Sequence, residues 1–325
     1  MKKVLIVRFS SIGDIVLTTP VVRCIKQQLG DVELHYLTKK TFQTLLEANP
    51  DIDKIYSIDK NLSEITPLLR EEKYTHIIDL HKNLRTLQLR IMLWKKFSSF
   101  NKLNFRKFLA VRLKWINLLP AVHIVDRYFK AVKVLGVTND GKGLDYFIPK
   151  DMNPIPTNIA NQLKEDYVAI VVGSKHTTKQ LPAQKLIEIG TNINKHIALL
   201  GGKDDIKIAE EICKQLPHAV NCCGLLSLHQ SAYLVKNASS VLTNDTGLMH
   251  IAAAFHKKII SVWGNTIPEF GMYPYLPESI KELSTIIEIK GLSCRPCSKI
   301  GYNNCPKGHF NCMNQMNSHE ISKYL

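Results

Sequence analysis

Residues 240–262, Ser-Val-Leu-Thr-Asn-Asp-Thr-Gly-Leu-Met-His-Ile-Ala-Ala-Ala-Phe-His-Lys-Lys-Ile-Ile-Ser-Val, contain the pattern that decides the fold. Two apolar runs of strand length, Ser240–Thr243 and Ile259–Val262, enclose a helical segment at Leu248–Phe255. A strand, a helix and a second strand in succession indicate a parallel sheet that is covered by helices on both faces.

The same alternation extends through the rest of the chain in two series. The predicted strands are Val4–Val7, Glu33–Leu37, His76–Leu80, Tyr167–Val172 and Ile197–Leu200, and helical patterns lie at 41–48, 61–72, 182–194, 204–216 and 228–236. Between the two series, Pro149–Pro156 contains three prolines, which cannot sustain a helix or a central strand. We therefore expect an α/β protein with two doubly wound domains, at 1–152 and 153–325, joined by this linker.

Two such domains usually bind their ligand in a cleft between the carboxyl ends of the two sheets. No G-x-G-x-x-G sequence follows a predicted strand, which disfavours a nicotinamide-dependent dehydrogenase.

The composition excludes several classes of protein and points to an anionic partner. The chain has 325 residues, 45% of them hydrophobic and 22% charged, which are ordinary values for globular domains and disfavour disorder. Its formal net charge of +15 suits nucleic acid, a phosphorylated metabolite or an acidic membrane surface. Arg8 interrupts the first apolar run after four residues, so Val4–Val7 reads as a strand and not as a signal peptide, and we expect a cytoplasmic protein.

The turn after the first predicted strand, Ser10-Ser11-Ile12-Gly13-Asp14, is the first candidate site. Gly13 would let a substrate approach the backbone, and Asp14 would point into the cleft. The alternative is that Asp14 caps a helix. Because Thr18-Thr19-Pro20 also fits a helix cap, we expect Asp14 to lie in the loop before that helix.

The loop Gly173–Pro182 follows the first strand of the second series and is the second candidate site. It contains hydroxyls, a glycine and the lysines Lys175 and Lys179, which suit an anion that lies against the start of a helix. A solvated polar loop is the alternative.

The third candidate site, Asn244–Gly247, joins a strand directly to a helix. Gly247 leaves space for a ligand, and the first amides of the helix suit an anion. Asp245 would repel a phosphate, so it is expected to cap the helix or to accept hydrogen bonds from ligand hydroxyls. His250 lies four residues after Thr246 and shares its helix face, where a structural role is the alternative.

In this order, the three sites resemble glycosyltransferase family 9, the ADP-heptose:lipopolysaccharide heptosyltransferase family. Arg8–Pro20 is similar to its opening motif, Asp79–Arg85 to its acceptor-domain segment and Asn244–Ala254 to its donor motif. The resemblance implies a GT-B fold, in which two Rossmann-like domains face each other across a cleft. It also implies inverting transfer of a heptose from ADP-heptose to a lipopolysaccharide inner-core acceptor, without a catalytic metal or other cofactor.

The resemblance assigns a role to each matching residue. It implies that Asp14 is the general base and that Lys179 offsets the charge of the departing nucleoside diphosphate. Lys175 replaces a hydroxyl residue of the family, and Leu181 replaces an aromatic one. The implied donor-binding residues are Ser174, Lys175, Asp205, Asp245, Thr246, Gly247 and His250, and the implied acceptor-binding residues are Gly13, Lys82, Arg85, His123 and Arg127. Ordinary helix-surface positions are the alternative for the last two residues.

The middle of the first series carries much of the positive charge. Between Asp79 and Asp126 the chain has no acidic residue but ten cationic ones, which are interleaved with Trp, Phe and Leu residues. This composition is typical of a segment that lies on an anionic membrane, and it predicts peripheral association with the inner face of the inner membrane. The alternative is a solvated basic face over an ordinary core.

Four of the eight cysteines, Cys294, Cys297, Cys305 and Cys312, lie near the C-terminal end. They fit either packed reduced thiols, which we favour, or a structural zinc site with no role in catalysis.

Two rival functions keep the same fold. One is a transferase for another nucleotide sugar, and the other is a basic RNA-binding protein without catalysis. The sequence has no RNA-recognition signature, so we expect no nucleic-acid partner.

Overall fold

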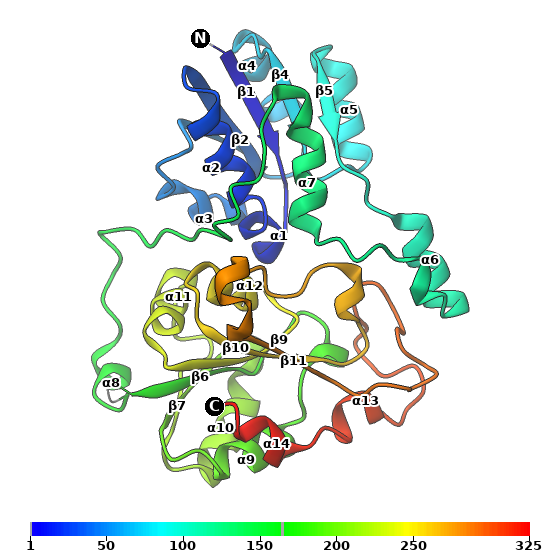
Figure 1. Ribbon diagram of the computed structural model, residues 1–325. Helices are drawn as coiled ribbons and strands as arrows, with labels where there is room; N and C mark the ends of the chain where they lie inside the picture. The colour runs from blue at the N-terminus through cyan, green and yellow to red at the C-terminus, as the bar shows by residue number, and fades with distance from the viewer. Residues whose placement is uncertain (1, 164–165) are drawn as a thin grey trace. The chain divides into compact units, whose positions relative to one another are not determined.

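The computed structural model describes residues 2–163 and 166–325, and these residues form two compact units. Unit 1 comprises residues 2–102 and 122–149, and unit 2 comprises residues 103–121 together with the described residues from 150 onward. Each unit contains one parallel sheet with helices on both faces (Figure 1). The predicted α/β class with two doubly wound sheets is therefore confirmed.

Unit 1 is built on a five-stranded sheet in the order β3-β2-β1-β4-β5. Its central strand β1 is buried at residues 4–7. Leu5 and Val7 pack with residues of α4 and α5, and α2 contacts α7 on the opposite face (Figure 1). The elements of this unit are β1 (Lys2–Val7), α1 (Ile12–Val16), α2 (Thr19–Gln28), β2 (Val32–Lys39), α3 (Thr44–Glu47), β3 (Lys54–Ile58), α4 (Thr66–Glu71), β4 (His76–Asp79), α5 (Leu84–Leu93), β5 (Phe97–Ser99) and α7 (Ile124–Val132).

Unit 2 is built on a six-stranded sheet in the order β11-β10-β9-β6-β7-β8. Apolar residues of α9, α10, α13 and α14 fill the core on one face, and α11 packs against α12. Its elements are α6 (Asn104–Leu113), α8 (Thr157–Ala160), β6 (Tyr167–Val171), α9 (Ala183–Thr191), β7 (His196–Leu200), α10 (Ile206–Gln215), β8 (Ala219–Asn221), α11 (Leu228–Asn237), β9 (Ser240–Asn244), α12 (Gly247–Ala254), β10 (Lys258–Trp263), β11 (Ser284–Glu288), α13 (Asn311–Asn314) and α14 (Ser318–Ser322).

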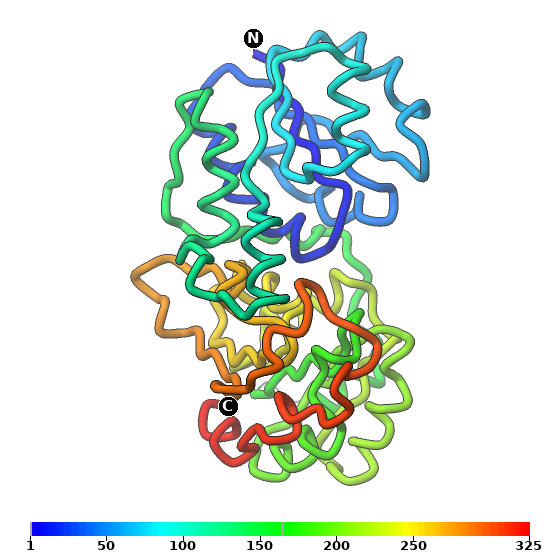
Figure 2. The backbone as a smooth tube through the Cα atoms, turned by 90° about the vertical axis from the view of Figure 1, so that its right-hand side faces the viewer, coloured from blue at the N-terminus to red at the C-terminus, as the bar shows by residue number. Residues whose placement is uncertain are grey.

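The segment 103–121 departs from the predicted division of the chain at residue 152. Although its sequence lies among the residues of unit 1, α6 and the short 3₁₀ helix Ile116–Leu118 pack with unit 2 (Figure 2). Ala110 forms a buried cluster with Ile267 and Phe270. The contact through Ala110 thus places α6 in the second unit, which a division by sequence position could not anticipate.

Candidate active site

The first group of predicted site residues lies at the carboxyl edge of the unit 1 sheet. The strand order reverses between β1 and β4, and ligands bind open α/β sheets beside such a switch point. Arg8 and α1 follow β1, and Leu80–Arg85 follow β4. The topology thus brings together two segments that are about 70 residues apart in the sequence.

Asp14 lies in the first turn of α1, and not in a loop as the sequence predicted. The Asp14 carboxylate accepts hydrogen bonds from the Ser11 backbone N–H at 3.2 Å and from the Ser11 hydroxyl at 2.9 Å. It therefore closes the first turn of the helix, as the capping interpretation expected. Capping does not exclude chemistry, because the side chain keeps an exposed fraction of 23%.

Arg8 is a site residue that the sequence prediction missed. An Nη atom of its guanidinium lies 2.6 Å from the Asp14 carboxylate. The same guanidinium donates to the Ser10 carbonyl at 2.7 Å and to the Tyr128 hydroxyl at 3.2 Å. The signal that could have identified it is a cation that directly follows the uninterrupted apolar run Val4–Val7.

The environment of Asp14 keeps its carboxyl group ionised. Burial opposes ionisation, but the positive charge of Arg8 and the donors of Ser11 outweigh it, so the pKa of Asp14 is lowered. The side chain is a carboxylate at neutral pH, oriented by an arginine that is itself 7% exposed.

Cationic and aromatic side chains surround this pair. The Arg85 guanidinium lies over the Phe9 ring at 5.6 Å from its centre, and the Lys82 ammonium donates to the Phe100 carbonyl at 2.9 Å. Lys102, which the sequence prediction did not single out, is half-buried, and burial together with the charge of Arg8 lowers its pKa. Because Lys102 interacts electrostatically with both Asp14 and Lys82, it belongs to the same cationic neighbourhood.

His123 and Arg127 are buried, each with an exposed fraction of 2%. The helix-surface alternative is therefore wrong for both residues. His123 is the N-cap of α7, where its Nδ1 accepts from the Val125 N–H at 3.2 Å. Burial lowers the pKa of Arg127. Arg127 directly precedes Tyr128, whose hydroxyl accepts a hydrogen bond from Arg8. Helix α7 therefore contacts the Arg8–Asp14 pair through Tyr128.

The second group of predicted residues lies at the switch point of the unit 2 sheet, between β6 and β9. Gly173 follows β6 and packs against Asp205, since a Cβ atom at position 173 would lie 1.9 Å from an Asp205 carboxylate oxygen. The same oxygen accepts from the Gly202 N–H at 2.8 Å. Burial raises the pKa of Asp205. Position 173 thus requires a glycine, because the loop Gly173–Pro182 begins in contact with the Asp205 side chain.

Lys179 and Asp245 join the two loops by an ion pair of 2.6 Å, in which each side chain is 14% exposed. The Thr266 hydroxyl donates to the same Asp245 oxygen at 3.0 Å. The carboxylate therefore binds Lys179 and Thr266. It does not cap α12, so the capping interpretation of Asp245 is wrong. Thr266 follows β10 and carried no recognisable signal in the sequence.

The remaining predicted donor residues lie on the same loops. Ser174 is half-buried and Lys175 is exposed. Thr246 is the N-cap of α12, and its hydroxyl lies 3.3 Å from that of Thr243. Gly247 begins the helix and His250 is buried within it.

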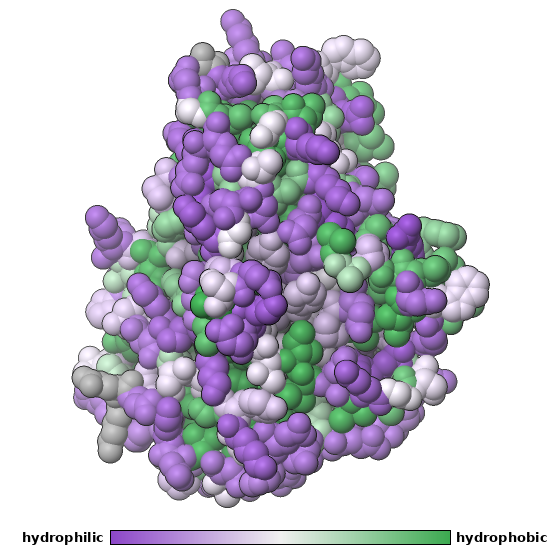
Figure 3. Space-filling model, viewed as in Figure 1, coloured by the Kyte–Doolittle hydropathy of each residue, from purple (hydrophilic) through white to green (hydrophobic). Residues whose placement is uncertain are grey.

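The basic middle segment divides into core residues and exposed residues. Leu89, Leu93 and Phe100 are buried, so the prediction of a continuous membrane-facing segment is wrong for these residues. Other apolar side chains are exposed on α5, on α6 and in the residues that directly follow each helix (Figure 3): Leu84, Leu87, Ile91, Trp94, Phe105, Phe108, Leu113, Trp115 and Leu118. On α5, Leu84, Leu87 and Ile91 recur at helical spacing and form one stripe, and Trp94 follows the end of the helix.

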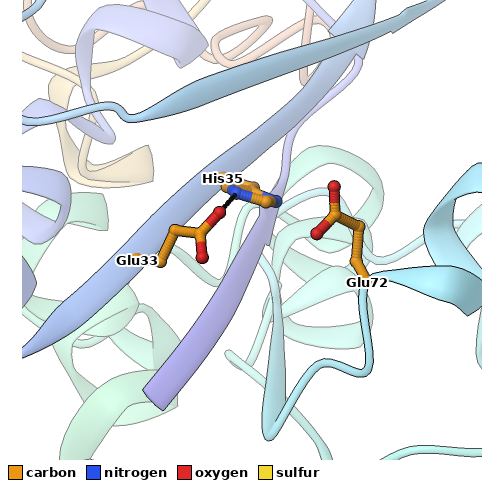
Figure 4. A group of neighbouring side chains, drawn as sticks. All are labelled: Glu33, His35 and Glu72. Carbon is orange, nitrogen blue, oxygen red and sulfur yellow. Dashed lines mark hydrogen bonds and ion pairs between the residues drawn. The ribbon is translucent and has the colours of Figure 1, made fainter. Parts of the chain in front are cut away.

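Among the described residues, one group of metal-capable atoms already lies within 4.8 Å: Glu33, His35 and Glu72 (Figure 4). Glu33 accepts from His35 at 2.7 Å, and the Lys3 ammonium pairs with both carboxylates. Lys54 also binds Glu72, at 2.7 Å. In the described residues, lysines thus pair with both acidic groups of this charge network.

Comparison with known proteins agrees with this arrangement. The family model described as glycosyltransferase family 9 (heptosyltransferase) matches residues 64–305. Lipopolysaccharide heptosyltransferase 1 of Campylobacter coli is 24% identical over 293 residues, which cover 81% of this chain and 84% of the relative.

Solved structures share the fold. A glycosyl transferase family 9 protein from Veillonella parvula matches with a TM-score of 0.78 at 18% identity, over 99% of this chain and 96% of its own. The Escherichia coli ADP-heptose lps heptosyltransferase II matches with a TM-score of 0.69 at 16% identity, over 100% and 97%. An iron-containing dodecameric glycosyltransferase from enterotoxigenic E. coli matches with a TM-score of 0.58 at 14% identity, over 99% and 77%.

Proposed function

Because this chain belongs to glycosyltransferase family 9, the heptosyltransferases, it is a glycosyltransferase, and we propose that it transfers a heptose from ADP-heptose to the inner core of lipopolysaccharide. The observation that carries the proposal is the Asp14 carboxylate, held ionised by Arg8 at the switch point of the first sheet. The names of the relatives support the choice of donor and acceptor.

In the proposed reaction, an acceptor hydroxyl attacks the anomeric carbon of the donor while Asp14 removes the hydroxyl proton. The bond from the anomeric carbon to the diphosphate oxygen breaks, and ADP leaves with the bonding electrons. A single displacement inverts the configuration at that carbon and requires one base and a stabilised leaving group. An ionised carboxylate that is already oriented suits the base.

Lys179 is proposed to stabilise the charge that develops on the departing diphosphate, in place of a catalytic metal. Its ammonium is held at the switch point of the second sheet by Asp245. Asp205, beside Gly173, would accept hydrogen bonds from the nucleoside, and Ser174, Lys175 and the start of α12 would contact the phosphates. Activity that does not depend on added Mg²⁺ or Mn²⁺ is the expected result for transfer without a catalytic divalent metal.

The acceptor side is proposed to recognise a phosphorylated core sugar. Lys82, Arg85 and the missed Lys102 lie in the neighbourhood of Asp14, where cations suit phosphate groups. His123 and Arg127 would support this side through α7.

The decisive experiment is Asp14→Asn, assayed with ADP-heptose and a truncated lipopolysaccharide acceptor. This variant should bind donor as wild type does but lose transfer by about 10²-fold or more, the contribution typical of a general base. The exposed Asp59→Asn is the matched control. Full activity of Asp14→Asn would remove Asp14 from the mechanism. A panel of ADP-, UDP- and GDP-sugars in the same assay tests whether another nucleotide sugar is the donor.

We further propose that the enzyme acts at the inner face of the inner membrane, where a lipid-linked acceptor would be located. Among the described residues, no helix is both long and apolar enough to cross a bilayer. In the first unit, the exposed stripe of α5 precedes the exposed cations Lys95 and Lys96. In the second unit, exposed aromatic residues of α6 alternate in sequence with Arg106 and Arg112. Each combination by itself favours an anionic lipid surface.

Sedimentation with anionic vesicles tests this association. Reversal of four exposed cations, Lys95, Lys96, Arg106 and Arg112, to glutamate should abolish cosedimentation. Lys107 is left intact because its ammonium lies over the Phe270 ring, at 5.3 Å. The matched control reverses four exposed lysines elsewhere, at Lys130, Lys133, Lys207 and Lys214, and has the same net charge. Equal cosedimentation of the two variants would contradict the proposed surface.

A further inference from the structure

We propose that Cys294, Cys297, Cys305 and Cys312 bind one structural metal ion as a tetrathiolate, and that this ion fixes the segment that supports the donor-site loops. This proposal replaces the packed reduced thiols that the sequence alone favoured. The proposal goes beyond the transfer reaction, because it assigns a second site whose role is to hold the first one in place.

The cysteines lie in and next to a long irregular segment. Residues 289–310, between β11 and α13, contain neither helix nor strand. Structureless segments of this length are uncommon in compact domains and need another source of order. Cys294 and Cys297 form a C-x-x-C pair within the segment, and Cys312 lies in α13 directly after it. A tetrathiolate is a common means of ordering such a segment.

The four thiols share one neighbourhood. All are free, and the Cys297 thiol donates to the Cys294 carbonyl at 3.2 Å. Cys312 is 4% exposed and interacts electrostatically with the other three thiols. No three of these sulfur atoms lie within 4.8 Å of one another in the described chain, so metal binding must rotate cysteine side chains to bring them together. Soft thiolate donors in a set of four select zinc or a single iron.

Two cations are positioned to offset the charge of such a site. Four thiolates around a divalent ion have a net charge of −2, which is costly in a partly buried segment unless it is compensated. The Lys114 ammonium donates to the carbonyls of Cys294 and Pro296, at 3.1 and 2.7 Å. Arg295 is 7% exposed and interacts electrostatically with Cys312.

The same segment supports both donor-site loops. Tyr302, between Cys297 and Cys305, bonds Thr178: its N–H donates to the Thr178 hydroxyl at 2.8 Å, and its carbonyl accepts from the Thr178 N–H at 3.1 Å. Thr178 directly precedes Lys179. Arg295 donates to the Thr266 carbonyl at 3.1 Å, and Thr266 binds Asp245. A metal that fixes the cysteines would therefore also fix the Lys179–Asp245 pair.

Metal analysis of the full chain is the first test. The protein should be purified without an affinity tag from cells supplied with zinc and iron, and its metal content measured by mass spectrometry. We expect one zinc or iron ion per chain in wild type and in the control Cys24→Ala/Cys213→Ala, and almost none in Cys297→Ala/Cys305→Ala. The measured element identifies the ion. An equal metal content in the two double variants, or metal-free wild type, would overturn the proposal.

Two further measurements keep the test valid if the double variant unfolds. Co²⁺ added to chelator-treated wild type should give thiolate-to-cobalt charge-transfer bands and the intense visible bands of a tetrahedral site. Hydrogen exchange should show stronger protection of residues 174–181 with Zn²⁺ than after chelation. Absence of the thiolate–cobalt bands, or exchange in that loop that does not respond to Zn²⁺, would count against the site. Neither readout depends on transfer activity.

Discussion

The Arg8 guanidinium lies 2.6 Å from the Asp14 carboxylate, and the two residues flank the turn that follows β1. Arg8 is nearly buried and has further bonds to Ser10 and Tyr128, so its position is fixed independently of Asp14. The arginine therefore lowers the pKa of the carboxyl group and also limits its orientation. In the proposed reaction, Arg8 is a positioning residue for the base.

Replacement of Arg8 by Gln should raise the pKa of Asp14, because burial then acts against ionisation without the opposing cation. We expect kcat to fall by about 10²-fold, as misplaced catalytic groups do. The acidic limb of the kcat/KM profile should move to higher pH, whereas Arg8→Lys should keep it nearer the wild-type position. The exposed Arg70→Gln is the control. A loss of activity without a shift of the acidic limb would limit Arg8 to a structural role.

The Lys179–Asp245 ion pair predicts strong coupling between two loops. Lys179→Met should lower kcat by about 10²-fold, because it removes charge stabilisation from the leaving group. Asp245→Asn should weaken the same function by releasing the lysine. Because the two side chains are in direct contact, a double-mutant cycle should give a coupling energy of about 1 kcal/mol or more. Strict additivity of the two effects would show that Asp245 acts independently of Lys179.

Gly173→Ala should damage the nucleoside side of the donor site. The new Cβ would lie 1.9 Å from an Asp205 carboxylate oxygen, so that side chain must move. Loss of a hydrogen bond to a charged group costs about 1.5–3 kcal/mol, so the KM for ADP-heptose should rise by about tenfold or more. Transfer kinetics measure the KM for ADP-heptose, and calorimetry measures the affinity for ADP. Asp204→Ala, a change at the exposed residue next to Asp205, is the control. Wild-type ADP affinity in Gly173→Ala would exclude Asp205 from the nucleoside site.

The charge network around Glu72 predicts a pH-dependent contribution to stability. Bonds from Lys3, Lys54 and Tyr56 lower the pKa of Glu72 to about 2, from an ordinary value of 4.5. A lowered pKa contributes stability that is present above the unfolded-state pKa and is lost as pH falls toward the folded-state pKa. Glu72→Gln should therefore destabilise unit 1 by about 2 kcal/mol at pH 7.

Urea unfolding between pH 7 and pH 2.5 measures this contribution. The difference between wild type and Glu72→Gln should shrink below about pH 4.5, because the carboxyl group of the unfolded wild-type chain then binds a proton while that of the folded protein stays largely ionised. A constant difference down to pH 2.5 would mean that Glu72 stabilises through packing alone.

Much of the architecture could be predicted from hydrophobic periodicity. Runs such as Val4–Val7 and Tyr167–Val172 are buried on both faces, and their uniform apolar composition identifies them without tertiary information. Strands β5 and β8 were missed because three residues are too few to show a period. The edge strand β11 was missed because its half-buried residues have no clear apolar run.

The positions of candidate site residues were predictable where the residue follows a predicted strand within a recognisable motif. Asp14, Lys179, Asp245 and Asp205 each follow a predicted strand, and the structure places each at the carboxyl edge of its sheet. Their contacts were not predictable. Thr266 and Lys102 belong to no motif and reach the site by folding, and the motif Arg8–Pro20 does not show that the Arg8 side chain pairs with Asp14.

The sequence by itself determined two parallel α/β sheets, their loops and the family, because periodicity and local motifs depend on neighbours in the chain. Only the tertiary structure decided that residues 103–121 pack with the second unit, that Arg8 orients Asp14, and that the cysteine segment supports Thr178 and Thr266. These relationships join residues through space, and the burial and charge that stabilise them exist only after the chain has folded.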